Sequence, residues 1–377
     1  MIVNLPLGNF LTEYTERNVD NAYHPVAVGR YGIRTRESIY SKELAKDYSK
    51  NKLIYKNTLT VGMGSVQIDI GVLADDVVYS VSPAYHTYRI AGINPDYLRY
   101  CLECRNQDMF VRYVKKGSRQ GKTIDLKRWL MYEIPVYSEV EQKHIVEKID
   151  HISYLIQTTQ AQLSKLDELV KSRFIELFGT IIANPYGFPT ATLKEVCHKI
   201  TDGKHGGCEQ EADSGYYYVG AREIYDGSIH YDTAPQITYA DFAKDYKRCN
   251  IERGDMVIVN TGATIGKTAI ATSPLTERTL LQKSVALLKV KTEIISAEFL
   301  RHCYMANPSM YRVESASAQP NLLLSKMNAT RIYLPPLELQ EQFAAFVEQT
   351  DKSKLAVQNG LQKLEILKKA LMQKYFG

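Results

Sequence analysis

A segment of about 40 residues occurs twice in this chain, and the repeat constrains the fold more than any other feature. The first copy begins with Ile-Pro at residues 134–135 and the second with Leu-Pro at residues 334–335, 200 residues later. Both copies end on Phe-Gly, at residues 178–179 and 376–377, 198 residues apart. Matching beginnings and ends at an almost constant spacing indicate a duplicated structural unit.

Each copy predicts a long helix. In the first copy, apolar residues follow alternating steps of three and four, the seam spacing of a coiled coil: Ile145, Ile149, Ile152, Ile156, Leu163, Leu166, Val170 and Leu177. The second copy keeps a shorter stripe of Val357, Leu361, Leu364 and Leu371. A helix of about 40 residues is roughly 60 Å long, longer than one domain needs. We therefore expect the two helices to pair with each other rather than to lie each on its own domain.

Weaker similarities precede each helix and indicate that the domains are related too. The stretch INPDYLRYC at residues 93–101 resembles ISAEFLRHC at residues 295–303. The segment NPYGFP, with two prolines and a glycine, is typical of a domain boundary. We expect a first globular domain, a helical spacer, a second globular domain and a C-terminal helix, over residues 1–138, 139–183, 184–335 and 336–377. The expected fold class is mixed α/β: two similar globular domains separated by two long helices that form an antiparallel coiled coil, with an approximate two-fold axis.

The composition is that of a soluble globular protein and leaves the partner open. Among 377 residues, 45% are hydrophobic and 24% are charged, and no apolar run approaches the roughly 18 residues of a membrane span. The N-terminus has no basic segment ahead of an apolar core, so we expect no secretory signal. Six irregularly placed cysteines favour a cytoplasmic location. A net charge of +5 permits a polyanionic partner without requiring one.

The stretch NTGATIGKTAI at residues 260–270 comes close to a phosphate-binding loop but does not complete one. That motif requires G-x-x-x-x-G-K-[ST], so that enough backbone N–H groups surround a phosphate. Gly266, Lys267 and Thr268 supply its end, but Thr261 stands where the first glycine is needed. We therefore interpret the stretch as a strand, a glycine turn and a second strand.

Other catalytic and metal-binding patterns are incomplete. Cys101 and Cys104 form a C-x-x-C within a helical pattern, but no second pair completes a zinc site. The sequence NPYG at residues 184–187 resembles the adenine-binding loop of amino-methyltransferases, yet it lacks the second proline and any glycine-rich cofactor loop. We therefore expect no catalytic residue, no bound metal and no cofactor in this chain.

Several motifs together resemble the specificity (S) subunits of type I restriction-modification systems. They are YLPPLELQEQ and LKKALMQKYFG in the second helical copy, and TLKEVCHKITDGKH, YYYVGAREIYDG, IERGDMVIVNTGATIGKTAI and SAQPNLLLSKM in the second domain. The resemblance covers nearly the whole chain. It implies two target recognition domains, each reading one half of an asymmetric, bipartite duplex DNA target. It also implies as partners two modification (methyltransferase) subunits that carry S-adenosylmethionine, and restriction subunits that form an ATP/Mg-dependent endonuclease.

The candidate DNA-binding residues lie in loops that combine Lys or Arg with Gln, Asn, Ser or Thr, since such loops can grip phosphates and read base edges. The first-domain candidates are Arg30, Arg34, Arg36, Lys115, Lys116, Ser118, Arg119, Gln120 and Lys122. The second-domain candidates are Lys204, His205, Arg222, Thr264, Lys267, Gln319 and Asn321. The segment KKGSRQGK, with four cations in eight residues, is the strongest of them. For contact with partner subunits we expect outward positions at Glu141, Gln142, Glu341 and Gln342.

Two other classes of function stay open from the sequence. One is an enzyme that uses ATP or S-adenosylmethionine through the incomplete motifs above. The other is a coiled-coil scaffold that joins two protein-binding modules and has no DNA role. Binding of either nucleotide cofactor by the isolated chain would identify the enzyme, and salt-dependent binding to duplex DNA would exclude the scaffold.

Overall fold

The computed structural model describes residues 2–39, 47–116, 121–180, 183–310 and 322–377. The chain divides into two compact units. The first comprises Met1–Ala161 and Gln358–Gly377, and the second comprises Gln162–Val357. Each unit therefore contains one globular domain together with part of each long helix.

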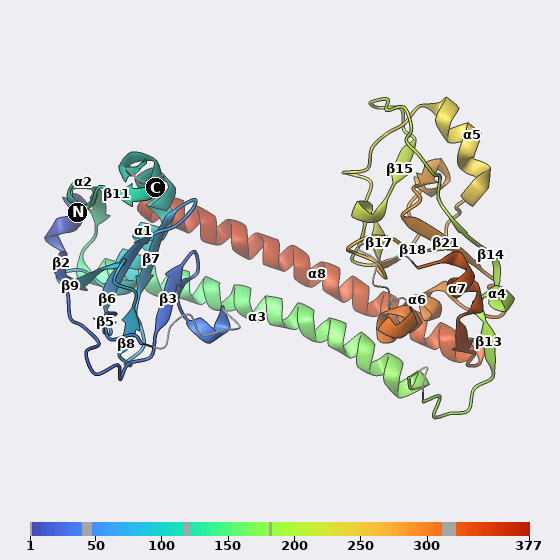
Figure 1. Ribbon diagram of the computed structural model, residues 1–377, viewed down its shortest axis with the longest axis horizontal. Coiled ribbons are helices and arrows are strands. Elements are labelled where there is room, and N and C mark those ends of the chain that lie inside the picture. The colour runs from blue at the N-terminus through green and yellow to red at the C-terminus, as the bar shows by residue number, and fades with distance from the viewer. Residues whose placement is uncertain (1, 40–46, 117–120, 181–182, 311–321) are drawn as a thin grey trace. The chain divides into compact units, whose positions relative to one another are not determined.

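The first domain is mixed α/β (Figure 1). Its strands are β1 (Val3–Pro6), β2 (Leu11–Tyr14), β3 (Val26–Gly29), β4 (Gly32–Thr35), β5 (Lys52–Ile54), β6 (Thr58–Met63), β7 (Ile68–Val72), β8 (Tyr79–Val81), β9 (His86–Ile90), β10 (Val114–Lys116), β11 (Lys122–Ile124) and β12 (Glu133–Val136). Its helices are α1 (Pro95–Tyr113) and α2 (Leu126–Trp129). Asn94 begins α1, because its side chain accepts hydrogen bonds from the first free amides of the helix.

The second domain follows the same order of main elements. Its strands are β13 (Thr190–Thr192), β14 (Cys197–Asp202), β15 (Tyr217–Val219), β16 (Ile224–Tyr225), β17 (Ser228–Ile229), β18 (Met256–Val259), β19 (Thr268–Ile270), β20 (Thr279–Leu281), β21 (Val285–Val290) and β22 (Arg331–Tyr333). Its helices are α4 (Leu193–Val196), α5 (Tyr239–Cys249), α6 (Ala297–Ala306) and α7 (Leu324–Ala329). Ser296 caps α6 as Asn94 caps α1, by accepting a hydrogen bond from a free amide of the first turn.

The two domains share one sheet topology. The first contains a four-stranded antiparallel sheet in the order β2-β9-β6-β7, and the second contains one in the order β14-β21-β18-β19. A separate antiparallel pair joins the start of each domain to its end: β1 with β12, and β13 with β22. The duplication recognised in the helices therefore extends to the domains.

A helix covers one face of each four-stranded sheet. Buried side chains of α1 share a core with those of β6 and β9, namely Tyr97, Leu98, Cys101 and Leu102 with Leu59, Val61 and Tyr88. The equivalent core beneath α6 contains Phe299, Leu300, Cys303 and Tyr304 with Met256, Ile258, Ala286 and Leu288. Each fully buried large apolar side chain contributes roughly 1.5–3 kcal/mol, so these clusters hold each helix to its sheet.

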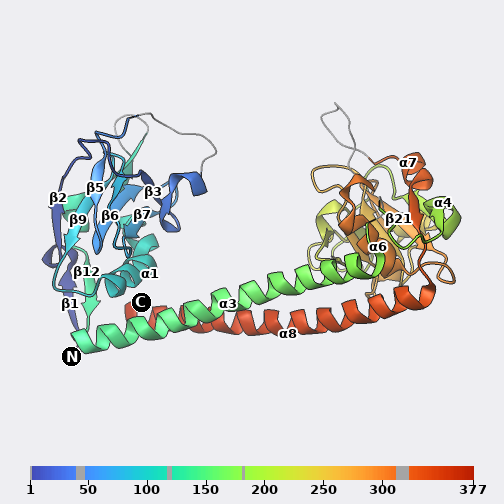
Figure 2. The same ribbon diagram turned by 90° about the horizontal axis from the view of Figure 1, so that it is seen from below.

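The repeated segments form two long helices, as predicted, α3 (Glu139–Phe178) and α8 (Leu337–Phe376), each of 40 residues (Figures 1 and 2). In the first unit, Ile145 and Ile149 near the start of α3 share a core with Phe376 at the end of α8. In the second unit, Phe178 at the end of α3 shares a core with Phe343 near the start of α8. The helices therefore run antiparallel, and each domain core contains the start of one long helix and the end of the other.

One glutamine ties the start of each long helix to its domain. Gln142, which is 4% exposed, accepts a hydrogen bond from the Asn94 amide at 2.9 Å and donates to the carbonyl five residues earlier at 2.8 Å. Gln340, which is fully buried, accepts from the Ser296 amide at 2.9 Å and donates to the carbonyl five residues earlier at 2.9 Å. Because Asn94 and Ser296 are the caps of α1 and α6, each glutamine connects a long helix to the helix of its domain.

This equivalence corrects two predictions. Gln142 corresponds to Gln340, 198 residues later, and not to the exposed Gln342, so the match of Pro135 with Pro335 is out of register by two residues. The predicted outward position of Gln142 is also wrong. Its side chain is buried because the groups with which it forms hydrogen bonds lie inside the domain.

Candidate nucleic-acid interface

The ends of three strands of the second sheet, β14, β18 and β21, bring the candidate loops together at one end of the sheet. The amide of Gly203, just after β14, donates to the Val285 carbonyl at 3.0 Å. The amide of Asn260, just after β18, donates to the Ser284 carbonyl at 3.0 Å, and the Asn260 carbonyl accepts from the Leu322 amide at 2.7 Å. Three segments therefore meet at this end of the sheet: the loop after β14, which contains Lys204 and His205, the β18–β19 turn, which contains Thr264 and Lys267, and the chain at Leu322. Gln319 and Asn321, just before Leu322, lie outside the described residues.

The segment that resembles a phosphate-binding loop is a β-hairpin. Strands β18 and β19 pair antiparallel, and the Val259 and Lys267 backbones close the turn with a 2.8 Å hydrogen bond. Gly262 and Gly266 have φ of 102° and 89°, values that favour glycine. A phosphate-binding loop leads into a helix N-terminus, whereas this turn leads into a strand. The interpretation as strand, glycine turn and strand is confirmed, with Lys267 exposed and Thr264 half-buried on the turn.

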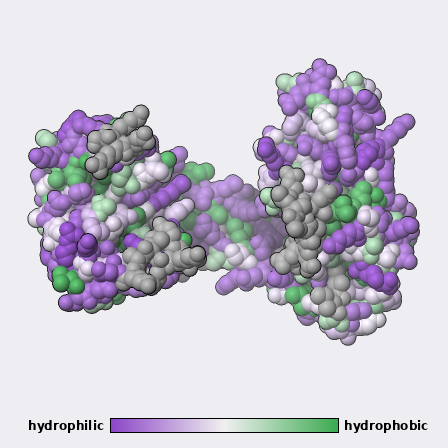
Figure 3. Space-filling model, in the orientation of Figure 1, coloured by the Kyte–Doolittle hydropathy of each residue, from purple (hydrophilic) through white to green (hydrophobic). Residues whose placement is uncertain are grey.

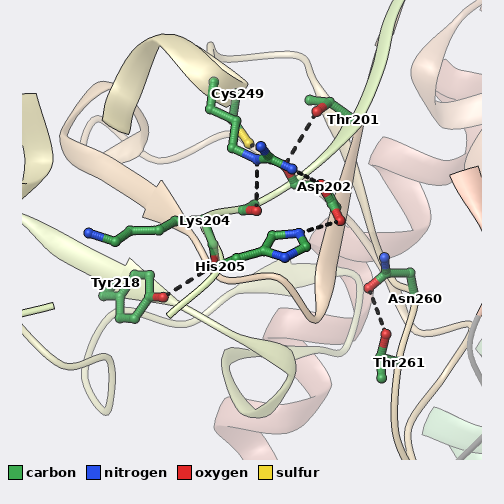
Figure 4. Close-up of polar contacts among 10 residues, drawn as sticks. Thr201, Asp202, Lys204, His205, Tyr218, Cys249, Asn260 and Thr261 are labelled. Carbon is green, nitrogen blue, oxygen red and sulfur yellow. Dashed lines mark hydrogen bonds and ion pairs between the residues drawn. The ribbon is translucent and has the colours of Figure 1, made fainter. Parts of the chain in front are cut away.

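Asp202, at the end of β14, organises the loop that follows (Figure 4). Its carboxylate lies 3.0 Å from His205 Nε2 and also accepts from the Arg248 guanidinium on α5. Arg248 Nε donates in addition to the carbonyls of Asp202 and Gly203, at 3.0 and 2.9 Å. Burial raises the pKa of Asp202, but the hydrogen bonds from Arg248 and His205 outweigh it, and the net pKa lies below its usual value. The carboxylate thus holds the partly exposed side chains of Arg248 and His205 at this end of the sheet.

Lys204 is already paired with carboxylates of its own domain. Its ammonium lies 2.7 Å from Asp245 Oδ2 and 3.7 Å from Asp241 Oδ1, both on α5, and its side chain is 12% exposed. The Lys204 side chain points away from that of His205 (Figure 4). A mostly buried ammonium group that already pairs with two carboxylates is poorly available for a hydrogen bond to a phosphate. The structure therefore favours His205 over Lys204 as a DNA contact.

We expect Asp202→Ala to lower the free energy of unfolding of the second domain by about 1–3 kcal/mol at pH 7, because the mostly buried carboxylate no longer accepts the charge-assisted hydrogen bond from Arg248. A carboxylate with a lowered folded pKa stabilises above its unfolded pKa and loses that effect as the pH falls through the folded value. The difference from the unchanged chain should therefore shrink below about pH 4. Urea unfolding followed by circular dichroism, at pH 7 and below about pH 4, measures the loss in the free energy of unfolding. Asp232→Ala, which changes an exposed carboxylate, is the control. An equal loss at both pH values would show that the charge is not responsible.

The described ends of the predicted basic segment of the first domain lie in β10 and β11, which pair antiparallel. Lys122 Nζ donates to the Ser65 carbonyl in the β6–β7 turn at 2.6 Å, and Lys115 Nζ lies 2.8 Å from Asp125 Oδ2. This strand pair thus lies against the glycine turn of the sheet, as Leu322 does in the second domain. Lys116 lies within β10, and the remaining candidates Ser118, Arg119 and Gln120 are outside the described residues. Two of the four cations therefore already have partners in their own domain.

The candidate arginines lie on or beside β-hairpins. Arg30 and Arg34 are exposed on the β3–β4 hairpin, and Arg222 is exposed in the short turn between β15 and β16. Arg36 follows β4, is half-buried and lines a pocket of ≈ 260 Å³. Its Nε has no hydrogen-bond partner within the described ranges. None of the four forms an ion pair with a carboxylate in the described part of the chain.

The candidate partner-binding residues differ in their surroundings. Glu141 is exposed, but its carboxylate forms a capping box at the start of α3, accepting from the Ser138 amide and hydroxyl at 3.1 and 2.7 Å. Glu341 and Gln342 are exposed on the first turns of α8. Gln142 is buried, as described above. Only the second copy therefore presents both of its candidates to solvent.

No group of three or more His, Cys, Asp or Glu side chains within the described ranges is arranged to hold a metal ion. Cys101 is buried in α1, and burial raises the pKa of its thiol to about 12, which disfavours the thiolate that zinc requires. Where the chain is described, none of its helices combines the length and the apolar composition of a membrane span. The face in view in Figure 3 is mostly hydrophilic, with small separate apolar patches.

The sequence did not single out Asp202 and Arg248 as parts of the site. Asp202 adjoins the candidates in TDGKH and could have been included on that ground. Arg248 is 46 residues further along and belongs to a helix whose pattern carries no sign of this contact. Its role depends on the packing of α5 beside β14.

Comparisons with known proteins match the second domain and most of the second long helix to a family. The family model described as "Type I restriction modification DNA specificity domain" matches residues 185–367. The chain is 22% identical over 276 residues to the specificity subunit of the type I restriction enzyme EcoBI of Escherichia coli, a match that covers 64% of this chain and 57% of that protein. The chain thus spans a little over half the length of this curated relative.

Solved structures share the fold over the full chain. The S subunit of a type I restriction-modification system from M. genitalium has a TM-score of 0.59 at 16% identity, covering 100% of this chain and 96% of that one. A chain from a structure on complex assembly and conformational transition of the type I R-M system has a TM-score of 0.61 at 18% identity, covering 100% and 97%. At these identities the likeness shows the fold alone.

The fold and the matched domain define a class, that of type I DNA specificity-domain proteins with a duplicated domain and two long helices. Residues 185–367 match the specificity-domain family of type I restriction-modification systems, and the chain as a whole resembles the specificity subunits of these systems in sequence and in fold. Such subunits are non-catalytic, which supports the prediction that this chain is not an enzyme.

Proposed function

We propose that this chain is the sequence-recognition subunit of a type I restriction-modification complex and binds an asymmetric, bipartite duplex DNA target. The observation that carries the proposal is that, in both domains, cationic and polar loops meet at the equivalent end of the four-stranded sheet, beside the β6–β7 turn in the first and the β18–β19 turn in the second. The exposed basic side chains of the candidate loops differ between the domains: Arg30 and Arg34 on the β3–β4 hairpin of the first, His205, Arg222 and Lys267 in the second. Side chains read the edges of the bases in a groove. Domains with different side chains in these loops therefore select different half-sites.

The chain recruits its catalytic partners through the long helices. These helices repeat more faithfully than the domains, so two similar surfaces are available for two modification subunits. Exposed residues such as Glu341 and Gln342 lie on such a surface. S-adenosylmethionine binds to the modification subunits, and ATP with Mg²⁺ binds to the restriction subunits. The complex acts on DNA in the cytoplasm.

The test is selection of a randomised duplex DNA pool by the full chain. We expect enrichment of two separated half-sites, with an affinity that falls steeply with salt, by about 10³-fold or more between 50 and 200 mM, because phosphate contacts release counterions. Exchanging residues 184–335 for the second domain of another family member should change one half-site only. A chain with the unchanged second domain and a foreign first domain provides the matched control, in which the other half-site changes.

Two results would contradict the proposal. If no duplex is retained even at low salt, the chain is a scaffold without a DNA role. If either exchange alters both half-sites, the domains do not read DNA separately.

A further inference from the structure

The β3–β4 hairpin of the first domain has a tip that presents Arg30 and Tyr31. Its strands pair from Val26 with Thr35 to Gly29 with Gly32, which leaves Arg30 and Tyr31 as a two-residue turn. Gly32, with a φ of 75°, supplies the left-handed residue of the turn. Most side chains are compatible with turn positions that do not need positive φ, so the turn does not require an arginine and a tyrosine here, and a function for their side chains would account for them.

The tip concentrates positive charge around one exposed aromatic ring. Tyr31 is 69% exposed. The Arg34 guanidinium carbon lies 4.9 Å from the centroid of the Tyr31 ring, and that of Arg30 lies 5.8 Å from it. The hairpin contains no acidic residue. Two like charges beside one ring repel each other, and this repulsion is relieved when an anion binds.

The base of the hairpin is fixed to the domain. Val26 and Val28 are buried, and the Val28 carbonyl accepts a 2.9 Å hydrogen bond from the Tyr85 hydroxyl. The Ile33 side chain packs so closely over β7 that a Cβ at Gly71 would lie 2.5 Å from it. The tip is thus held on a rigid support beside the edge strand of the four-stranded sheet.

The second domain carries a related arrangement at the corresponding place. The sequence Val-Gly-Arg at residues 28–30 has its counterpart in Val-Gly-Ala-Arg at residues 219–222, which places the exposed Arg222 just after β15. The β16–β17 hairpin follows, and on it Tyr225 stacks on His230 with ring centroids 3.4 Å apart. Its turn forms a bridge to the edge strand β19 through Gly227. Both domains therefore place an arginine and an aromatic side chain beside the equivalent edge strand, β7 in the first domain and β19 in the second.

We propose that the β3–β4 hairpin enters the major groove of the first half-site, where Arg34 reads a guanine and Arg30 binds a flanking phosphate. The inference rests on the proposed function and names the reading element for one half of the target. A two-stranded ribbon fits the major groove, and a guanidinium that donates to guanine O6 and N7 is the commonest specific contact there. The Tyr31 ring orients the Arg34 plane before binding, since guanidinium groups stack on aromatic faces.

The experiment repeats the selection of a randomised duplex pool by the full chain with five variants. In R34A we expect the preference for one guanine in the first half-site to fall about 5- to 150-fold. R34K retains the charge without the planar fork, so it should lose the same preference while keeping more of the overall affinity. Y31A should weaken the preference, and Y31F should retain it. R112A removes an exposed arginine on α1 that is paired with Asp108, and it should bind like the unchanged chain.

The possible results separate the inference about the hairpin from the proposed function. Loss of one guanine preference in R34A and R34K, with the second half-site unchanged, supports the inference. A uniform loss of affinity in R34A with unchanged base preferences would overturn it, because the hairpin would then bind phosphates only. Unaltered selection by R34A and Y31A would overturn it as well and leave the proposed function standing. If the unchanged chain binds no duplex DNA, the proposed function itself fails.

Discussion

Replacing Phe376 with alanine is expected to destabilise the first domain by about 3–5 kcal/mol, although this residue lies at the end of the second long helix. The side chain is fully buried in the first core, with its ring centroid 5.1 Å from that of Tyr97. Domains are stable by only about 5–15 kcal/mol, so the loss is a large fraction of the total. The chain's single tryptophan, Trp129, is buried in the same core, and its fluorescence during urea unfolding therefore reports this domain alone.

Phe178→Ala is the matched comparison. Phe178 ends the first long helix and packs in the second core, with ring centroids 4.8 Å from Phe299 and 5.5 Å from Phe343. We expect this variant to change the circular dichroism transition and to leave the Trp129 transition in place. Ile366→Ala removes an exposed side chain from the same helix as Phe376 and should change neither. A Trp129 transition that is unaffected by Phe376→Ala would mean that the end of α8 is not part of the first core.

Gln142→Leu is expected to destabilise the first domain by about 2–4 kcal/mol. The leucine keeps the approximate size of the side chain but leaves the Asn94 amide and the Tyr137 carbonyl without the partners seen here. Each buried group left unpaired costs about 1–3 kcal/mol. The Trp129 fluorescence again measures the effect. Because Asn94 caps α1, we also expect the start of that helix to exchange its amide hydrogens faster.

The second copy supplies the control for this prediction. Gln340→Leu removes the equivalent bonds to Ser296 and Pro335 and should destabilise the second domain instead. Gln342→Leu changes an exposed glutamine two residues later and should have little effect. If Gln342→Leu were as damaging as Gln340→Leu, the 198-residue correspondence of the two helix starts would be wrong.

The apolar periodicity of the repeat predicted the long helices well and their ends less well. Ile145, Ile149 and Ile152 are buried, as the seam requires. At the end of α3, however, Phe174 and Phe178 are more buried than the predicted Leu177. A heptad pattern assumes that one helix packs on another. Here the last turns also pack into a domain core, whose shape depends on residues more than 100 positions away.

The candidate DNA contacts show a similar division. Exposure of Arg30, Arg34, Arg222 and Lys267 agrees with what charged loop residues lead one to expect. Lys204 has the same local signature, yet two carboxylates of α5 occupy its ammonium group. Those carboxylates are about 40 residues away in sequence, so no local pattern separates Lys204 from a free lysine.

The amino-acid order was sufficient to establish the duplication, the two long helices, the strand–turn–strand nature of the phosphate-loop look-alike and the resemblance to specificity subunits. These features depend on periodicity and on motifs within a few residues of one another. The packing of the domains was needed to bring Asp202 to Arg248, to bury Gln142 and Gln340, and to place Phe376 in the first core. Each of these contacts joins segments that are distant in the chain or depends on burial, and both are set by how sheets and helices close around a shared core.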